Sequence, residues 1–398
     1  MSKNVKLTIA GIDAGNNSVK LILENGQTLN YENIYCERNK IKLERDYKIN
    51  GIEDVNKYTL KDYLDVEVCY DNEKYGFLFG EQAKVNKTKV SERENKYKST
   101  DNQLIMNSMV ALGNALISNL DKNEWKETLH FDVALSVGLP FHEYQIEGTI
   151  EDYKKRFLKT FKINFLNPSY PVRSVTITVK DIHVVIEGYS ALRQTLFDQG
   201  YFDKEVKKVK GKAASIIDIG CYSVDIVSGK FFRKVDEEGE EFPIFKSDNE
   251  ICTGITEGVG TAMDNVILSL SSELAREIGQ HRKITRQEIF AAAEEDNIIE
   301  GTKISIEPYY SQECARLGRM IGERYVQLIL QGGYKDTLVK IYVAGGGALN
   351  DFIMKSFKQV LKEEGFDLDI VEIVDNPVFA NATGYFNIAD ANFGVIEE

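Results

Sequence analysis

One short pattern occurs twice in this chain, once in each half, and it constrains the fold more than any other feature. Residues 12–21 read IDAGNNSVKL and residues 217–226 read IDIGCYSVDI. In each copy an apolar strand runs into Asp-x-Gly, a small polar turn and a second apolar strand, which predicts a β-hairpin. The backbone N–H groups at the tip of such a hairpin can hold phosphate oxygens. The two copies therefore predict two related lobes that bind a nucleotide, with an aspartate near the phosphates from each side.

Either copy alone is better explained as an ordinary turn, since glycine and asparagine favour turns in any protein. The two copies match in register at Ile, Asp, Gly, Ser and Val, and a third motif, Gly345-Gly346-Gly347, follows the apolar strand 340–344. Three residues without a Cβ let the backbone approach a flat or anionic ligand, and the helix that follows adds favourable partial charge. A tight turn explains one of these glycines easily and three poorly. Together the three motifs favour nucleotide binding.

Length, charge and cysteine content exclude several classes of function. A chain of 398 residues exceeds what one core usually holds, so two lobes are expected. The net charge of −13 argues against direct nucleic-acid binding, so any association with DNA would run through a basic adaptor. The five cysteines are widely spaced without a C-x-x-C pair, which indicates neither disulfides nor zinc and fits a cytoplasmic location. No apolar run reaches ~18 residues, so no membrane association is expected.

Periodicity places these motifs on secondary structure. It predicts a first hairpin from strands 5–12 and 19–23, a helix over 103–120, a strand over 131–139, a strand pair over 175–179 and 184–186, helices over 259–278, 286–295 and 311–330, and a terminal helix opened by Pro377. The stretch from residue 30 to 100 is rich in Lys, Glu, Asn and Tyr. We expect it to form a solvated, insertion-tolerant subdomain rather than a basic recognition patch.

Glu187 lies where the pattern changes from strand to helix. The apolar strand 184–186 precedes it, and helical spacing begins near Ala191 and Leu192. A carboxylate at this point is commonly a first-turn residue that interacts favourably with the helix dipole. It is also where an α/β fold presents a side chain to a ligand, at the carboxyl end of a strand.

In chain order, these landmarks resemble the ATPase family shared by actin, heat-shock chaperones and sugar kinases. The resemblance implies an α/β fold of two related lobes with a nucleotide cleft between them, lobe I being residues 1–188 plus 376–398 and lobe II residues 189–375. Within the family, the short first turn, the strand end Ser136-Val137-Gly138-Leu139-Pro140 and the closing Asn381-Ala382-Thr383-Gly384-Tyr385-Phe386 look most like the bacterial ParM-type plasmid-segregating actins.

The resemblance also implies a role for each motif residue. Asp13 and Asp218 would hold waters of Mg²⁺, which keeps most of its hydration shell. Lys20 would reach the phosphates as a point charge. Glu187 would position or activate the attacking water. The turn donors would be Gly15, Asn16, Asn17, Ser18, Gly220, Cys221, Tyr222 and Ser223. Gly345, Gly346 and Gly347 would approach the purine nucleoside, with a further purine contact near Arg286.

The implied activity is a polymerising ATPase or GTPase. Its subunits would join a filament when bound to nucleoside triphosphate, would hydrolyse it slowly, and would move plasmid or other DNA through a DNA-binding adaptor protein. One departure leaves the choice between ATP and GTP open. The family's second turn often reads Asp-x-Gly-Gly-x-Thr, whereas this chain has Cys221 and Ser223 at the last two conserved positions.

Other functions remain open at this point. A small-molecule kinase has the same fold, with the acidic residue deprotonating a hydroxyl instead of orienting water. A non-polymerising binding module is the second alternative, because Cys221 could narrow the approach to the phosphates. A chaperone would normally continue into a peptide-binding region, and the cell-division and cell-shape actins tend to carry a terminal amphipathic membrane helix. Neither feature is expected here.

Overall fold

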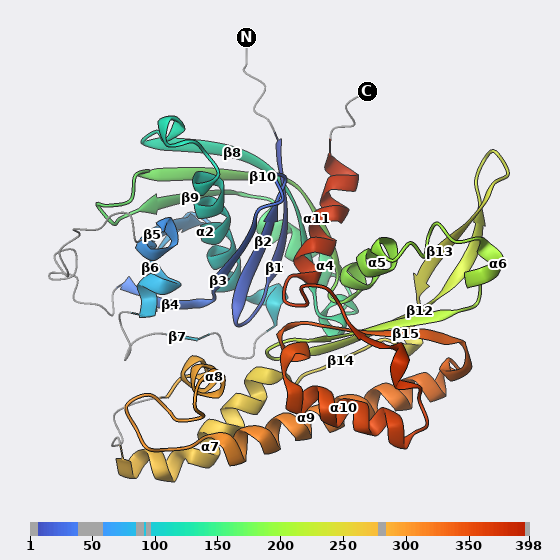
Figure 1. Ribbon diagram of the computed structural model, residues 1–398. Coiled ribbons are helices and arrows are strands. Elements are labelled where there is room, and N and C mark those ends of the chain that lie inside the picture. The colour runs from blue at the N-terminus through green and yellow to red at the C-terminus, as the bar shows by residue number, and fades with distance from the viewer. Residues whose placement is uncertain (1–6, 39–58, 85–90, 93–96, 278–283, 395–398) are drawn as a thin grey trace. The chain divides into compact units, whose positions relative to one another are not determined.

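The computed structural model describes residues 7–38, 59–84, 91–92, 97–277 and 284–394 (Figure 1). The chain divides into two compact units. Unit 1 comprises Met1–Leu139, Glu143–Val185 and Tyr385–Glu398, and unit 2 comprises Pro140–His142 and Ile186–Gly384. The boundary between Gly384 and Tyr385 therefore falls within the last helix, Ala380–Phe393. The lobe boundaries expected from the resemblance, after residues 188 and 375, stay a prediction.

Unit 1 is built on a ten-stranded sheet in the order β3-β2-β1-β8-β10-β9-β5-β6-β4-β7. Its strands are β1 (Leu7–Ala14), β2 (Ser18–Leu23), β3 (Thr28–Glu32), β4 (Ile34–Glu37), β5 (Asp65–Tyr70), β6 (Glu73–Phe79), β7 (Ser91–Glu92), β8 (Thr128–Leu139), β9 (Thr160–Phe165) and β10 (Ser174–Ile186). The predicted first hairpin is confirmed for the described residues, because β1 pairs antiparallel with β2 and parallel with β8. Val5, where that hairpin was expected to begin, lies outside them.

Helix α2 (Asn102–Ser118) supplies much of the core of unit 1, as the helical periodicity predicts. Its side chains are buried from Leu104 to Ile117. Gly113 lets the helix approach the sheet closely, since a Cβ there would lie 3.1 Å from Val175 Cγ1. The shorter helices of this unit are α1 (Glu81–Lys84), α3 (Phe141–Tyr144) and α4 (Thr149–Phe157), α3 starting in the short segment assigned to unit 2.

Two expectations for unit 1 are wrong. Residues 174–186 form the single strand β10 instead of a pair of strands. It lies between β8 and β9, and the sequence pattern did not reveal β9. The described part of the polar stretch 30–100 is not simply a solvated subdomain. Its strands β5 and β6 extend the sheet, and Val66, Val68 and Phe79 are fully buried. In β5 the buried Val66 and Val68 flank the charged Glu67, so a polar composition hides a buried strand.

Unit 2 is a layered α/β arrangement around a second sheet, in the order β13-β12-β11-β15-β16 with β14 paired to β12. Its strands are β11 (Ala213–Ile219), β12 (Val224–Val235), β13 (Glu241–Ser247), β14 (Thr253–Ile255), β15 (Leu338–Ala344) and β16 (Val371–Ile373). Its helices are α5 (Tyr189–Asp198), α6 (Val206–Val209), α7 (Val259–Glu277), α8 (Arg286–Glu294), α9 (Glu307–Gln331), α10 (Asp351–Glu363) and α11 (Ala380–Phe393), the last ending in unit 1. Helices α7, α9 and α10 share one core with the sheet, and α5 shares another.

The helices predicted in the second half are present. Those expected over 286–295 and 311–330 correspond to α8 and α9, and α7 begins at Val259 as predicted. The predicted end of α7, Ile278, lies outside the described residues. The terminal helix begins at Ala380 instead of Pro377, because the Pro377 carbonyl accepts a bond from the Gly345 N–H and belongs to the preceding turn. Among the described residues, no helix combines the length and apolar character needed to cross a membrane.

Candidate nucleotide-binding turns

The first repeated motif forms a tight turn between β1 and β2. The Gly15 N–H donates to the Ser18 carbonyl at 3.0 Å, which closes the turn. A side chain at position 15 does not fit, since a Cβ there would lie 2.7 Å from the Ser18 oxygen. The turn therefore needs glycine for the close approach of two backbone segments.

Buried Asp13 and partly buried Lys20 form an ion pair across this hairpin. They lie opposite each other in the strand register, and Lys20 Nζ is 2.9 Å from Asp13 Oδ2. Burial alone would raise the pKa of Asp13, but the charges of Lys20 and Lys98 and the hydrogen bond from Lys20 outweigh it and lower that pKa. Asp13 is therefore a carboxylate at neutral pH, the form that can accept hydrogen bonds from a hydrated cation.

Replacing Lys20 with methionine is expected to make the protein more sensitive to acid. A lowered folded-state pKa means that ionised Asp13 contributes stability above its unfolded pKa, and that this contribution is lost as the pH falls through the folded pKa. Without Lys20, burial of the carboxylate is less compensated, so the midpoint of acid unfolding should move to higher pH. Circular dichroism against pH measures this shift. Lys155→Met, which removes an exposed pair with Asp152, is the matched control and should leave the midpoint unchanged.

Two residues that support the first turn lie outside the sequence motifs. Asn33, which is 1% exposed, donates from Nδ2 to the Gly15 carbonyl at 2.7 Å and from its backbone N–H to the Asn17 carbonyl at 2.9 Å. Lys98 is buried, and its charge acts on Asp13. Its position is fixed because the backbone N–H groups of Lys98 and Ser99 both donate to the Glu143 carboxylate, each at 2.8 Å.

The Asn16 side chain bears on whether the first turn suits a ligand. Its Oδ1 is buried and has no hydrogen-bond partner within the described part of the chain. A buried polar atom without a partner is costly in a folded protein and calls for an explanation. A water or a bound polar group at the turn would supply the missing partner.

The second repeated motif forms the equivalent turn between β11 and β12, held by the start of α7. The Gly220 carbonyl accepts from the Val259 N–H at 3.0 Å, and the Cys221 carbonyl accepts from the Gly260 N–H at 2.6 Å. In a trans peptide the carbonyl and the next N–H point in opposite directions. Tying back these two carbonyls therefore directs the N–H groups of Cys221 and Tyr222 away from α7, where they can serve as anion donors.

The Cys221 side chain lies toward α7. A Cβ added to Gly260 would come within 2.4 Å of Cys221 Sγ, and one added to Gly258 within 2.5 Å of the Gly220 carbonyl oxygen. The two glycines that flank Val259 thus make room for the turn. Cys221 stands where the family often has a second glycine. Its side chain is accommodated because the thiol lies against the first turn of α7.

A hydrogen-bonded chain joins Asp218 to the Glu187 junction. Asn381 donates from Nδ2 to Asp218 Oδ2 at 2.6 Å, and its Oδ1 accepts from the Gly188 N–H at 3.0 Å. Asp218 and Glu187 are 7% and 4% exposed. The first residue of the closing motif therefore fixes both the second-turn aspartate and the backbone beside the predicted catalytic carboxylate.

The three consecutive glycines serve different purposes. Gly345 has φ of +79°, and a Cβ there would lie 2.4 Å from the Ile219 oxygen and 2.5 Å from Asp218 Oδ1. At Gly347 a Cβ would lie 2.2 Å from Ile219 Cγ2, whereas at Gly346 nothing lies within 4 Å. Two of the glycines are thus required by packing around the second turn, and Gly346 leaves open space that a ligand could use.

Arg286 does not extend freely into solvent, as a purine contact might. Its Nε donates to Asp264 Oδ1 at 3.0 Å, and its guanidinium lies 4.8 Å from the centre of the Tyr222 ring. Tyr222 Oη in turn donates to Asp264 Oδ2 at 3.0 Å. Burial raises the pKa of the Tyr222 hydroxyl, so it stays protonated as this donor. The group of three ties the second turn to α7 and α8.

Each unit thus assembles its own part of the predicted site. In unit 1 the single hairpin carries the predicted residues Asp13, Gly15, Asn16, Asn17, Ser18 and Lys20. In unit 2 three segments meet Asn381 around Asp218, and they carry Glu187, Gly220, Cys221, Tyr222, Ser223, Gly345, Gly346 and Gly347. Asn33, Lys98 and Asn381 are the supporting residues that reasoning from the sequence did not assign.

Comparison with known proteins agrees with this fold. Residues 11–189 match the family described as the actin-like proteins N-terminal domain. A 15-stranded ParM filament from Clostridium botulinum has a TM-score of 0.71 and 19% identity, covering 97% of this chain and 99% of the other. The actin-like protein Alp7A has a TM-score of 0.65 and 16% identity, covering 97% of each chain. An archaeal actin homologue in complex with ADP has a TM-score of 0.63 and 15% identity, covering 97% and 100%.

No curated protein matches the chain. At these identities the solved structures establish the fold, and the family match covers the residues from the first turn to the Glu187 junction. The resemblance inferred from the sequence motifs is therefore confirmed. The chain has the two-lobe actin-like fold, its residues 11–189 match the actin-like N-terminal domain, and ParM is among its structural neighbours.

Proposed function

We propose that this protein binds and hydrolyses a nucleoside triphosphate, and that backbone N–H groups of both repeated turns donate hydrogen bonds to its phosphate oxygens. One observation carries the proposal. In each turn two carbonyls are tied back by the surrounding structure, through Asn33 in unit 1 and through the start of α7 in unit 2, so that backbone N–H groups point the other way. Oriented N–H groups of this kind bind anionic oxygens. Either ATP or GTP fits this chemistry.

The residues present also suit a magnesium-bound nucleotide. Buried Asp13, held ionised by Lys20, and buried Asp218, held by Asn381, would accept hydrogen bonds from waters of Mg²⁺. The ion would offset the charge of the triphosphate when bound. Lys20, beside Asp13, would contact a phosphate oxygen, and Asn16 Oδ1 would gain the hydrogen-bond partner that it lacks. Gly346 would leave room for the nucleoside.

Glu187 is the residue we assign to orienting the attacking water. It is buried at the end of β10, and the adjacent Gly188 N–H is fixed by Asn381. A carboxylate held in one place can accept a proton or orient a water without the entropic cost of ordering it at each turnover. We assign no proton transfer beyond this positioning role.

We further propose that the nucleotide controls assembly into a filament that moves plasmid or other DNA through an adaptor protein in the cytoplasm. The net charge of −13 disfavours direct DNA binding, which is why an adaptor is needed. One structural neighbour is itself a ParM filament. Slow hydrolysis would then act as a timer, because subunits that carry diphosphate would hold their neighbours less tightly.

Light scattering after mixing the pure protein with Mg²⁺ and ATP or GTP tests this proposal. We expect scattering to rise above a critical concentration with one or both triphosphates, followed by phosphate release and a decline. The diphosphate and an excess of chelator serve as controls and should give no rise. Absence of assembly at any concentration with either triphosphate would reject the filament, and absence of phosphate release would reject the hydrolase.

A further inference from the structure

Three amide side chains form a line of hydrogen bonds from the first turn to the surface of unit 1. Asn33 Nδ2 donates to the Gly15 carbonyl at 2.7 Å, and Asn107 Nδ2 donates to Asn33 Oδ1 at 2.7 Å. Gln103 Nε2 then donates to Asn107 Oδ1 at 2.8 Å. Asn33 and Asn107 are each 1% exposed, so the inner part of this amide relay is shielded from water.

The inner end of the amide relay fixes the orientation of every member. A carbonyl oxygen can only accept, so Asn33 must turn its NH₂ group toward Gly15 and its Oδ1 toward Asn107. Asn107 must then present its own NH₂ group to Asn33 and its Oδ1 to Gln103. All the donors point the same way, and hydrogen bonds aligned in series within a low dielectric strengthen one another.

Asn33 holds the turn at two places. Besides the side-chain bond to Gly15, its backbone N–H donates to the Asn17 carbonyl at 2.9 Å. Because the carbonyl and the following N–H of a trans peptide point in opposite directions, these two bonds direct the N–H groups of Asn16 and Ser18 to the other side of the turn. Those are the groups that would meet phosphate oxygens.

We propose that Asn33 and Asn107 are positioning residues of the first phosphate turn, with Gln103 completing the relay. This inference rests on the proposed function, since it assigns the relay to the same nucleotide site. In the second turn both corresponding carbonyls are held by backbone N–H groups of α7, whereas in the first turn the Gly15 carbonyl is held by a side chain. A single substitution can therefore release the Gly15 carbonyl, while the backbone bond to the Asn17 carbonyl remains.

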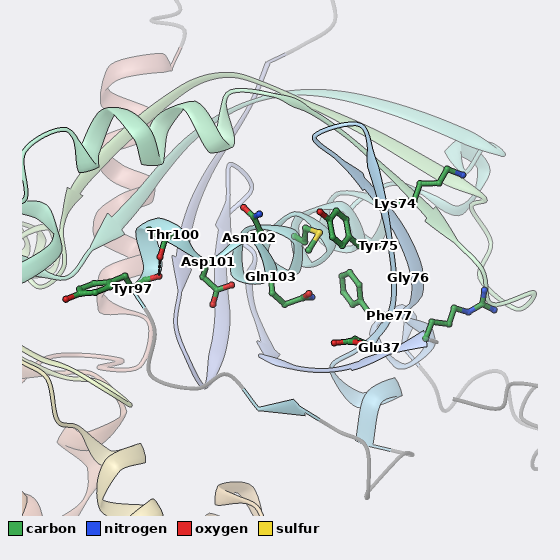
Figure 2. Close-up of a pocket in the computed structure, with 12 residues that line it drawn as sticks. Glu37, Lys74, Tyr75, Gly76, Phe77, Tyr97, Thr100, Asp101, Asn102 and Gln103 are labelled. Carbon is green, nitrogen blue, oxygen red and sulfur yellow. Dashed lines mark hydrogen bonds between the residues drawn. The ribbon is translucent and has the colours of Figure 1, made fainter. Parts of the chain in front are cut away.

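The outer end of the relay is open to solvent. Gln103 lines a pocket of about 1050 Å³ together with residues of β4, β6 and the start of α2, and Figure 2 shows its side chain among them. It is half-buried, in contrast to Asn33 and Asn107. Removal of its amide should therefore perturb the turn less than removal of either inner member.

Binding of fluorescent ATP and GTP analogues with Mg²⁺ tests the assignment. We expect Asn33→Ala to raise the Kd about tenfold, the effect typical of losing one buried hydrogen bond that holds a binding group. Asn107→Ala should raise it by less, and Gln103→Ala by about twofold on the same reasoning. If Asn33→Ala does not fold, Asn107→Ala and the half-exposed Gln103→Ala still decide the matter.

Asn114 provides a matched control on the same helix. It lies two turns beyond Asn107 and is likewise buried, but its amide bonds to Tyr31 Oη and Tyr170 Oη and takes no part in the relay. Asn114→Ala should lower the melting temperature about as much as Asn107→Ala and leave the Kd unchanged. Equal Kd values for the parent, Asn33→Ala and Asn107→Ala would overturn the assignment.

Hydrogen exchange without nucleotide separates this inference from the proposed function. Backbone amides of residues 14–21 should exchange faster in Asn33→Ala and Asn107→Ala than in the parent or Asn114→Ala. If the parent binds no nucleotide, the proposed function fails. The hydrogen exchange of residues 14–21 then tests the role of the relay by itself. Faster exchange confined to the turn would still support its control of the turn, and unchanged exchange would refute it.

Discussion

Replacement of Glu187 with alanine is expected to lower the rate of nucleotide hydrolysis by about 10²–10⁴-fold, the contribution typical of a positioned acid–base residue. The nucleotide should still bind, because the turn N–H groups proposed to bind phosphate and the two aspartates lie on other segments. Filaments formed with triphosphate should then persist longer, since fewer subunits reach the diphosphate state. Single-turnover phosphate release, nucleotide affinity and the decay of light scattering measure the three effects.

Glu187→Gln is the informative companion to that variant. It keeps the size of the side chain and removes its charge, so it should lose most of the activity if the carboxylate acts on water, and little if the residue only fills space. Thermal unfolding of both variants checks that the fold is intact. Hydrolysis at the parent rate in Glu187→Ala would remove this residue from the mechanism.

The second large effect is expected at Gly345. Alanine there must adopt φ near +79° and place its Cβ 2.4 Å from the Ile219 oxygen and 2.5 Å from Asp218 Oδ1. Backbone strain and overpacking together should lower the free energy of unfolding by roughly 2–4 kcal/mol. The displaced Asp218 should also weaken binding of a magnesium-bound nucleotide. Urea denaturation and nucleotide titration measure the two consequences separately.

Gly346 is the matched control for that variant. It is the next residue in the chain, it is not held at positive φ, and a Cβ there meets nothing within 4 Å. Gly346→Ala should therefore unfold at nearly the parent urea concentration. If it nevertheless weakens nucleotide binding, the open space beside it is where the ligand lies. Equal stability of the two variants would contradict the packing argument for Gly345.

Local sequence signals predicted the parts of the site that depend on local structure. The strand–turn–strand repeats gave both hairpins, and the change of periodicity at Glu187 gave the junction of β10 and α5. Each of these depends on neighbours a few residues away. The α/β class and the two-lobe fold were implied by the family resemblance that the motifs show in their chain order.

Contacts between distant segments could not be predicted in this way. Asn33 follows a short strand and Asn381 lies in the first turn of a helix, and neither position shows that its amide bonds to a residue of the repeated motifs. Strands β5 and β6 were hidden because a polar composition masked the buried residues that alternate in part of β5 and lie together at the end of β6. The continuous strand β10 was read as two because Lys180 and Asp181, both exposed, interrupt its apolar pattern.

The bond between Asn381 and Asp218 has a consequence for how the protein is made. The two residues are 163 positions apart, and a ribosome delivers the chain from its amino terminus. A nascent chain therefore exposes the complete second turn long before the amide that anchors its aspartate has been synthesised. A chain cut before Asn381 should therefore contain both strands of the second hairpin and lack the hydrogen bond that holds Asp218.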